Sequence, residues 1–154
     1  LDLIKEGNVQ LIWQTGKIYH SEIVERLKAY GELPMLQVMD FINDMGLAYR
    51  AADLVVSRAG ASSISEFCLI GKPVILIPSP NVAENHQTKN AMALVEKKAA
   101  ILVRDSDAPQ TLLRTAIDTV NNEECLKNLS QQILKLGLKD SANAIAEEVI
   151  RLAK

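Results

Sequence analysis

A turn of small residues after an apolar run is the segment of this sequence best suited to bind an anion. Residues 54–57 are nearly all apolar, and they are soon followed by Gly60, Ala61, Ser62 and Ser63. This pattern predicts a buried strand that ends here and a helix that begins with Ser62 or Ser63 as its cap. The free amides and the dipole of a first helical turn attract a pyrophosphate, and small residues let the backbone approach such a ligand closely.

Glu66 lies one turn into the same expected helix and could bind two vicinal hydroxyls of a ribose. A carboxylate accepts hydrogen bonds from both hydroxyls at once. The alternative is a capping box, because Ser63 and Glu66 have the Ser-x-x-Glu spacing that serves helix initiation alone. The segment also lacks the G-x-G-x-x-G pattern of dinucleotide-binding folds. Spacing alone therefore leaves both interpretations open.

A second polar segment, residues 78–87, follows another apolar run and precedes another helical pattern. Asn85 is a candidate helix cap, and His86 and Gln87 would face the same end of the fold as Glu66. The alternative is an ordinary exposed connection between a strand and a helix. His86 could act as a base, but the sequence alone does not assign a nucleophile or a carboxylate to it, so we give it no catalytic role.

A third segment could recognise a nucleobase. Phe41 and Ile42 could line a base pocket, with backbone groups reading the edge of the base. The alternative is core packing at the start of a helix, which the apolar pattern also fits. The simplest interpretation of residues 14–17 is a loop. A contact between this loop and a ligand is the alternative.

Short apolar runs and longer helical patterns alternate around these segments. We expect strands at residues 9–13, 35–39, 53–57, 73–77 and 100–103. We expect helices at residues 20–30, 43–52, 62–70, 85–98, 109–120, 123–136 and 141–153. Ser21 is a candidate cap for the first of these helices, and Gly71 would end the third.

The alternation predicts an α/β fold with a Rossmann-like, doubly wound parallel sheet. The near-continuous apolar character of residues 54–57 and 74–77 is typical of strands covered on both faces. Ligands of such sheets bind beyond the carboxyl ends of the strands. The three polar segments described above all follow strands, so we expect them to meet at one edge of the sheet.

Composition sets limits on the class of protein. The chain has 154 residues, of which 48% are hydrophobic, so it can bury the core of one domain. A net charge of -2 and an aromatic content of 4% argue against nucleic acid as a partner. Cys68 and Cys125 lie too far apart for a metal-binding pattern, and no apolar run is long enough to span a bilayer.

Several stretches resemble, in the same order, the MurG family of glycosyltransferases. They are residues 13–17, 41–45, 52–61, 65–66, 71–73 and 85–91. The resemblance implies a GT-B architecture, in which two Rossmann-like domains face each other across a cleft, with residues 1–154 as the single carboxy-terminal donor domain. It also implies an inverting enzyme that transfers N-acetylglucosamine from UDP-N-acetylglucosamine to lipid I, to form the peptidoglycan precursor lipid II.

The resemblance also assigns a set of donor-binding residues. By their position in the family's motifs, these are Ile42, Gly60, Ala61, Ser62, Ser63, Glu66, His86 and Gln87. Ile42 would contact uracil through its backbone, and Glu66 would bind the ribose hydroxyls. The four small residues would approach the pyrophosphate, and Gln87 with His86 would contact the sugar. The resemblance implies no metal or other cofactor, because helix amides stabilise the leaving UDP.

The chain departs from the family pattern at its beginning. The family's Gly-Gly-Ser loop is absent, and residues 1–5 look like the end of the helix that follows it. In the family, the amino-terminal domain carries the lipid I site, the membrane-facing surface and the candidate general base. We therefore expect no catalytic residue here and no transfer by this chain alone. The resemblance places the protein peripherally at the cytoplasmic face of the bacterial inner membrane, through that other domain.

The sequence is also compatible with other functions. The chain could belong to another GT-B enzyme, such as a lipid glucosyltransferase or a UDP-sugar epimerase. It could be a separately encoded donor-binding subunit, like the half-enzymes of eukaryotic dolichol glycosylation. It could also be a non-catalytic nucleotide-binding module, which would not discriminate UDP-N-acetylglucosamine from other nucleotide sugars.

Overall fold

Helices alternate with short strands in the computed structural model, which describes residues 1–80 and 85–153. The strands are β1 (Leu11–Gln14), β2 (Leu36–Met39), β3 (Val55–Ser57), β4 (Val74–Leu76) and β5 (Ile101–Leu102). The helices are α1 (Asp2–Glu6), α2 (Lys17–Lys28), α3 (Met45–Ala51), α4 (Ala61–Ile70), α5 (His86–Val95), α6 (Ala108–Val120), α7 (Glu123–Leu134) and α8 (Ser141–Leu152). Each strand and helix predicted from the sequence is found, so the α/β class is confirmed.

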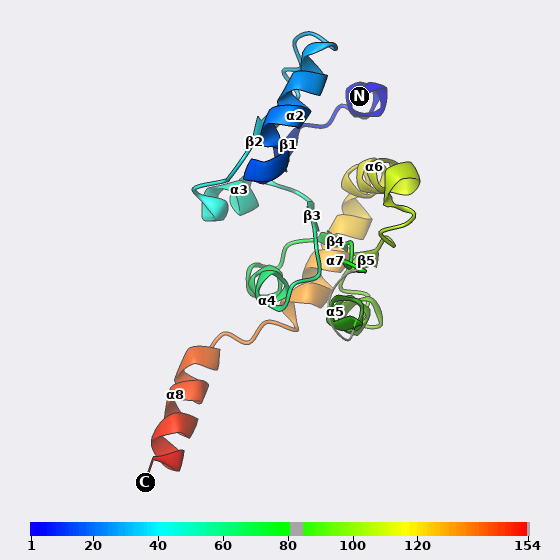
Figure 1. Ribbon diagram of the computed structural model, residues 1–154. Helices are drawn as coiled ribbons and strands as arrows, with labels where there is room; N and C mark the ends of the chain where they lie inside the picture. The colour runs from blue at the N-terminus through cyan, green and yellow to red at the C-terminus, as the bar shows by residue number, and fades with distance from the viewer. Residues whose placement is uncertain (81–84, 154) are drawn as a thin grey trace.

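The strands form two parallel sheets rather than one continuous sheet. β1 pairs with β2, with Leu11 opposite Leu36. β4 lies between β3 and β5, with Val55 opposite Val74 and Ile75 opposite Ile101. Figure 1 shows β1 and β2 with α2 as one group, and β3, β4 and β5 surrounded by α4, α5, α6 and α7 as another.

The edges of β1 and β3 have no strand partner among the described residues, and this separates the two sheets. Side chains on both strands are correspondingly open: Ile12 is 42% exposed, Trp13 40% and Val56 41%. β4 is buried at every position. The expectation that the strand at residues 53–57 is covered on both faces is met in part: Leu54 and Val55 pack against different core clusters, while Val56 stays open at the edge.

The core lies around β4, whose side chains alternate between its two faces. Val74 and Leu76 pack in one cluster with side chains of α4, α5 and α7, among them the buried Phe67. Ile75 and Ile77 pack in a second cluster against α6. Successive side chains of a strand point to opposite faces, so helices cover this sheet on both sides, as a doubly wound fold requires.

The carboxyl end of α4 is fixed by a glycine and by a hydrogen bond to α7. This glycine is Gly71, which has a left-handed backbone with φ 67°, as the sequence predicts. The carbonyl of Gly71 accepts a hydrogen bond of 2.7 Å from the hydroxyl of Ser130 on α7. This bond joins the end of α4 to α7 across the core.

Ser21 is not a helix cap. α2 begins four residues earlier, at Lys17, and its N-cap is Gly16 with φ 76°. Ile18 and Tyr19, which the predicted boundary left outside the helix, form its first turn and are exposed. A helix start without a buried residue leaves no signal in the hydrophobic periodicity.

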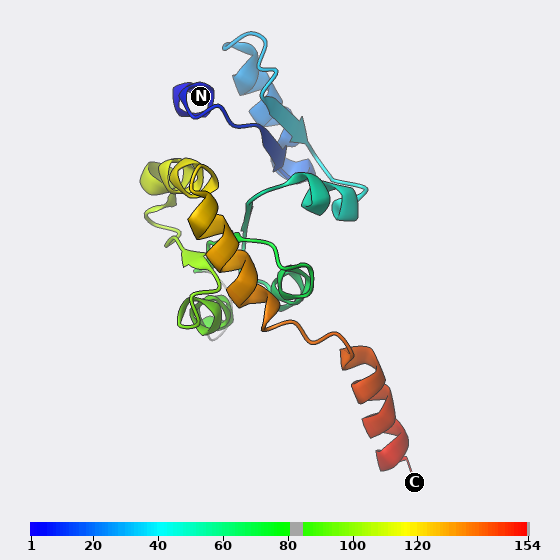
Figure 2. The same ribbon diagram turned by 180° about the vertical axis from the view of Figure 1, so that it is seen from behind.

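Helix α8 lies apart from the rest of the chain in both views (Figures 1 and 2). Ile145, Val149 and Leu152 occupy one face of it at helical spacing, and all three are exposed. The helix is amphipathic, but its apolar face contributes nothing to the core described above.

Candidate functional site

The amino end of α4 presents free backbone amides. Its N-cap is Gly60, and the first hydrogen bond of the helix runs from the amide of Ile64 to the carbonyl of Gly60, at 3.0 Å. The amides of Ala61, Ser62 and Ser63 come before that bond, so they have no acceptor within the helix. Among residues 1–80 and 85–153, no side chain caps this end. The helix therefore starts with donors and a positive dipole end directed beyond β3.

The predicted caps are wrong, since Ser62 and Ser63 lie inside the first turn of α4. A capping box also requires its serine at the N-cap, and that position is Gly60. Glu66 is not part of such a box: it binds a different residue, Tyr49. Because no side chain occupies the amides of the first turn, a ligand can.

Gly60 is not required by the fold itself. Its backbone has φ -69° and ψ 142°, which any residue adopts. A Cβ added there would meet nothing closer than the hydroxyl of Ser63, at 3.9 Å. The glycine instead leaves open space in front of the free amides, which suits the close approach of a ligand.

Glu66 is exposed on α4 and accepts a hydrogen bond from Tyr49 on α3. The hydroxyl of Tyr49 lies 3.1 Å from Oε2 of Glu66. Partial burial, together with this bond and the charge of Glu66, raises the pKa of Tyr49 to about 12. Tyr49 is therefore a neutral phenol at physiological pH and donates its proton to the carboxylate.

Helix α5 reaches two of the loops that follow the strands. Oε1 of Gln87 accepts a bond of 2.9 Å from the amide of Ser79, beyond β4. Nδ2 of Asn90 donates at 3.2 Å to the carbonyl of Ala59, beyond β3. Gln87 thus lies at the predicted edge of the sheet, where it holds the loop after β4, and Asn90 is a positioning residue that the sequence interpretation missed.

The start of α5 is less regular than predicted. Asn85 is the N-cap, but it has a left-handed backbone with φ 58°, and its side chain accepts from the hydroxyl of Thr88 rather than from an amide. His86 is the first residue of the helix and is exposed. Residues 81–84 of the predicted polar segment lie outside the described residues.

Ile42 lies in the loop after β2, beside the loop after β1. Its amide donates a hydrogen bond of 2.9 Å to Oε1 of Gln14, the last residue of β1. The two loops are further joined by Thr15, whose amide donates to the carbonyl of Met39 at 2.9 Å. The backbone of Ile42 is therefore held at the carboxyl ends of β1 and β2, where the sequence predicted a base-reading group.

Arg58 joins the loops after β3, β4 and β5, and the sequence interpretation did not single it out. Its guanidinium donates to the carbonyl of Ile77 at 3.3 Å and forms an ion pair with Asp105. Asp105 is 47 positions away in the sequence. The position of Arg58 directly after a strand is the one sequence signal that could have indicated a role for it. No signal in the neighbouring sequence predicts Asp105 as its partner.

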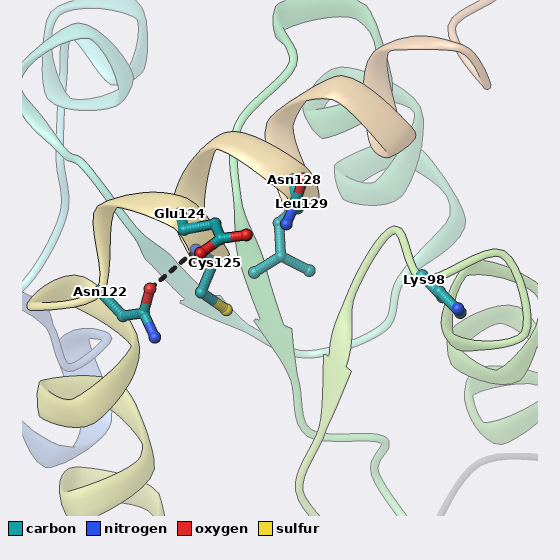
Figure 3. A pocket seen from close by; sticks show the side chains of 6 residues that line it. All are labelled: Lys98, Asn122, Glu124, Cys125, Asn128 and Leu129. Carbon is teal, nitrogen blue, oxygen red and sulfur yellow. Dashed lines mark hydrogen bonds between the residues drawn. The ribbon is translucent and has the colours of Figure 1, made fainter.

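A surface pocket of about 360 Å³ lies elsewhere, and Figure 3 shows the side chains that line it. They are Lys98, Asn122, Glu124, Cys125, Asn128 and Leu129. Lys98 precedes β5, so the pocket is near the amino end of that strand, opposite to the edge where the free amides lie. Parallel α/β folds bind ligands at the carboxyl edge, so we do not take this pocket as the functional site.

Parallel strands, helices on both faces and free helix amides at the carboxyl edge define a nucleotide-binding type of α/β fold. The chain belongs to glycosyltransferase family 28 as its C-terminal domain, since the model of that domain matches residues 1–147.

Known proteins agree with this assignment. The chain is 63% identical over its whole length to a Bacteroides fragilis protein and 61% identical to one from Bacteroides thetaiotaomicron. Both are named UDP-N-acetylglucosamine--N-acetylmuramyl-(pentapeptide) pyrophosphoryl-undecaprenol N-acetylglucosamine transferase. The chain spans 41% and 42% of the length of these relatives.

Solved structures show the same fold. The crystal structure of Acinetobacter baumannii MurG has a TM-score of 0.81 and 26% identity, and the match covers 92% of this chain and 43% of that one. The glycosyltransferase VinC in complex with dTDP has a TM-score of 0.61 and 20% identity, over 82% of this chain and 32% of that one. The GT-B type of α/β fold expected from the sequence is thus confirmed. Among the described residues, no helix combines the length and apolar character needed to cross a bilayer.

Proposed function

We propose that this chain is the donor-binding domain of an inverting transferase that moves N-acetylglucosamine from UDP-N-acetylglucosamine to lipid I, forming lipid II. The observation that carries the proposal is the amino end of α4, where uncapped amides lie one turn from the carboxylate of Glu66. Membership of family 28 and the names of the two Bacteroides relatives support this donor and this acceptor.

The diphosphate of the donor binds at the start of α4 in this proposal. The amides of Ala61, Ser62 and Ser63 donate to its oxygens, and the absent side chain of Gly60 gives it room. The same donors stabilise the negative charge that develops on UDP as the glycosidic bond breaks. Charge stabilisation by amides and a helix dipole needs no bound metal.

The other donor contacts follow from the same placement. Glu66 accepts from the ribose hydroxyls, and the backbone of Ile42 reads the uracil edge. Gln87 and His86, at the start of α5, contact the N-acetylglucosamine. Gln87 already binds the amide of Ser79 through one atom of its carboxamide, which leaves the amide nitrogen to donate to a sugar hydroxyl.

We further propose that residues 1–154 form one donor domain that lacks the start of its first βα unit, and that a strand of a longer polypeptide lies between β1 and β3. The observed order is β2-β1 and then β3-β4-β5. A doubly wound sheet of order 3-2-1-4-5-6 gives this arrangement when its first strand is taken out. The partnerless edges and the exposed Trp13 and Val56 support the proposal.

In this proposal, the acceptor and the membrane contact the part of the polypeptide outside this chain. Lipid I is held in a membrane, so we propose that the enzyme associates peripherally with the cytoplasmic face of the bacterial inner membrane through its amino-terminal domain. The catalytic base lies in that domain too. Residues 1–154 incubated with donor and lipid I should then form no lipid II, and clear turnover would contradict this division of roles.

Glu66→Ala in the complete polypeptide that carries this chain tests the donor site. We expect a large rise in the KM for UDP-N-acetylglucosamine, because the ribose loses its charged acceptor. Glu32→Ala is a matched control, since Glu32 is exposed and precedes β2, at the opposite end of the strands. An unchanged donor KM in Glu66→Ala would remove Glu66 from the ribose role.

A comparison of donors tests the assigned reaction. The complete polypeptide should transfer N-acetylglucosamine to lipid I much faster than it transfers glucose from UDP-glucose. Equal rates with the two donors, or transfer only to a different lipid, would indicate another GT-B enzyme. Binding of both nucleotide sugars without transfer to any lipid would indicate a non-catalytic module.

A further inference from the structure

Tyr49 and Glu66 come from different helices and meet at the edge of the proposed donor site. They are 17 positions apart in the sequence, on α3 and α4. The phenol of Tyr49 has one proton and donates it to Oε2 of Glu66 at 3.1 Å. For Oε1, the structure has no hydrogen-bond partner within residues 1–80 and 85–153. The bond therefore distinguishes the two oxygens of an otherwise exposed carboxylate.

The ring of Tyr49 is fixed by the core rather than by Glu66. It packs edge-on against Phe67, with ring centroids 5.6 Å apart and an interplanar angle of 80°. Phe67 is only 1% exposed and belongs to the main core cluster. Asp44 also fixes the start of α3, because its carboxylate accepts from the amide of Leu47 at 2.8 Å. The phenol is thus a fixed donor, and the carboxylate is the mobile partner that it orients.

The protonation of Tyr49 suits this arrangement. Partial burial and the proximity of Glu66 raise its pKa to about 12, so the hydroxyl keeps its proton at neutral pH. Glu66, as the acceptor, keeps Oε1 without a hydrogen-bond partner among the described residues. An exposed glutamate without such a bond would sample several rotamers and would have to be ordered by the ligand.

We infer that Tyr49 is a positioning residue for nucleotide binding: it holds Oε2 of Glu66 so that Oε1 is preset to accept from the 2′-hydroxyl of the ribose. The inference rests on the proposed function, which makes Glu66 the ribose ligand. Tyr49 itself does not touch the donor. Its removal leaves Glu66 present but less ordered, so the loss falls on nucleotides that carry both ribose hydroxyls.

The test measures binding of UDP and of 2′-deoxy-UDP to the complete polypeptide and to its Tyr49→Phe variant. Phenylalanine keeps the ring against Phe67 and removes only the hydroxyl. We expect UDP affinity to fall roughly 3- to 10-fold, the usual range for one lost hydrogen bond, and 2′-deoxy-UDP affinity to change less than about 2-fold. Tyr30→Phe, at an exposed site far from Glu66 in the sequence, should change neither.

A double-variant cycle separates positioning from a structural effect. If Tyr49 acts through Glu66, Tyr49→Phe should have no further effect on UDP affinity in a Glu66→Ala background. An equal loss in both backgrounds, or an equal loss for UDP and 2′-deoxy-UDP, would overturn the inference. At saturating donor, kcat should be unchanged in Tyr49→Phe, with the effect confined to the donor KM.

The result for the unsubstituted protein distinguishes failure of the proposed donor site from failure of the positioning role of Tyr49. If it binds UDP and 2′-deoxy-UDP equally well, the ribose role of Glu66 fails, and the proposed donor site fails with it. If it prefers UDP and Tyr49→Phe keeps that preference in full, only the positioning role of Tyr49 fails.

Discussion

The amide of Ile42 donates a hydrogen bond of 2.9 Å to Oε1 of Gln14, which joins the loops after β1 and β2. In the proposed site, the backbone of Ile42 reads the uracil of the donor. The side chain of Gln14 therefore accepts the hydrogen bond from the same amide N–H that the base would bind. A carboxamide and the edge of uracil present the same kind of carbonyl acceptor, so in the proposed site Gln14 would take the place of the base when no nucleotide is bound.

Gln14→Ala should expose this amide. We expect its hydrogen exchange to become faster in the variant, because its only observed acceptor within the described residues is gone. Addition of UDP should then slow the exchange again, since the base takes the vacant place. Backbone amide exchange measured by NMR checks both steps, and Gln10→Ala, an exposed glutamine before β1, is the control. If UDP leaves the exchange of Ile42 fast in Gln14→Ala, the base does not bind this amide.

Gly60→Ala should weaken nucleotide binding without destabilising the fold. The backbone of Gly60 suits alanine, and the nearest atom to the added Cβ would be the hydroxyl of Ser63, at 3.9 Å. We expect the free energy of unfolding to change by less than about 0.5 kcal/mol, as for most surface substitutions. UDP affinity should fall at least about tenfold, equivalent to about 1.4 kcal/mol, because the methyl group occupies the approach to the α4 amides. Calorimetry and thermal unfolding measure the two quantities, and unchanged UDP affinity would place the diphosphate elsewhere.

Gly71→Ala, at the other end of the same helix, should have the opposite effect. Gly71 has φ 67°, and an added Cβ would lie 3.3 Å from Cδ1 of Leu134 on α7. We expect the free energy of unfolding to fall by about 1–2 kcal/mol, the penalty for a side chain in the left-handed conformation. UDP affinity of the folded protein should stay the same, because Gly71 is far along α4 from its amino end. Chemical denaturation tests this, and a variant as stable as the parent would show that residue 71 does not need the left-handed conformation at the end of α4.

The comparison of Gly60 with Gly71 shows what the sequence could and could not reveal. Gly71 was recognised as a helix end because glycine after an apolar helical run is a strong local signal. Gly60 was placed correctly in the turn before this helix, but the cap was assigned to Ser62 or Ser63, which lie inside the helix. Serine is a good cap in general, and nothing local indicates that this helix is left uncapped.

Contacts between distant segments were beyond the sequence interpretation. The bonds from Tyr49 to Glu66, from Gln14 to Ile42 and from Arg58 to Asp105 span 17, 28 and 47 positions. Periodicity reports which face of an element is buried, not which side chains of two elements meet. The topology rule did predict the edge at which these loops gather, and for that reason a candidate site could be outlined before the bonds among its residues were known.

The pKa of Tyr49 leads to a prediction about stability at high pH. Its value of about 12 lies above the ordinary 10.0, so the folded state holds this proton more tightly than the unfolded state. The resulting stabilisation is complete below about pH 10 and is lost as the pH rises toward about 12. The Tyr49→Phe variant has no phenol and therefore lacks this pH-dependent stabilisation. Its free energy of unfolding should decline less than that of the parent between about pH 10 and about pH 12.

Ultraviolet titration of tyrosinate, together with denaturation at several pH values, checks this prediction. The chain has three tyrosines, and Tyr49→Phe should remove the component that titrates near pH 12. Tyr30→Phe, which changes an exposed residue, should leave that component in place. If the component near pH 12 persists in Tyr49→Phe, then burial and Glu66 do not hold the proton of Tyr49, and the bond between Tyr49 and Glu66 is not maintained in solution.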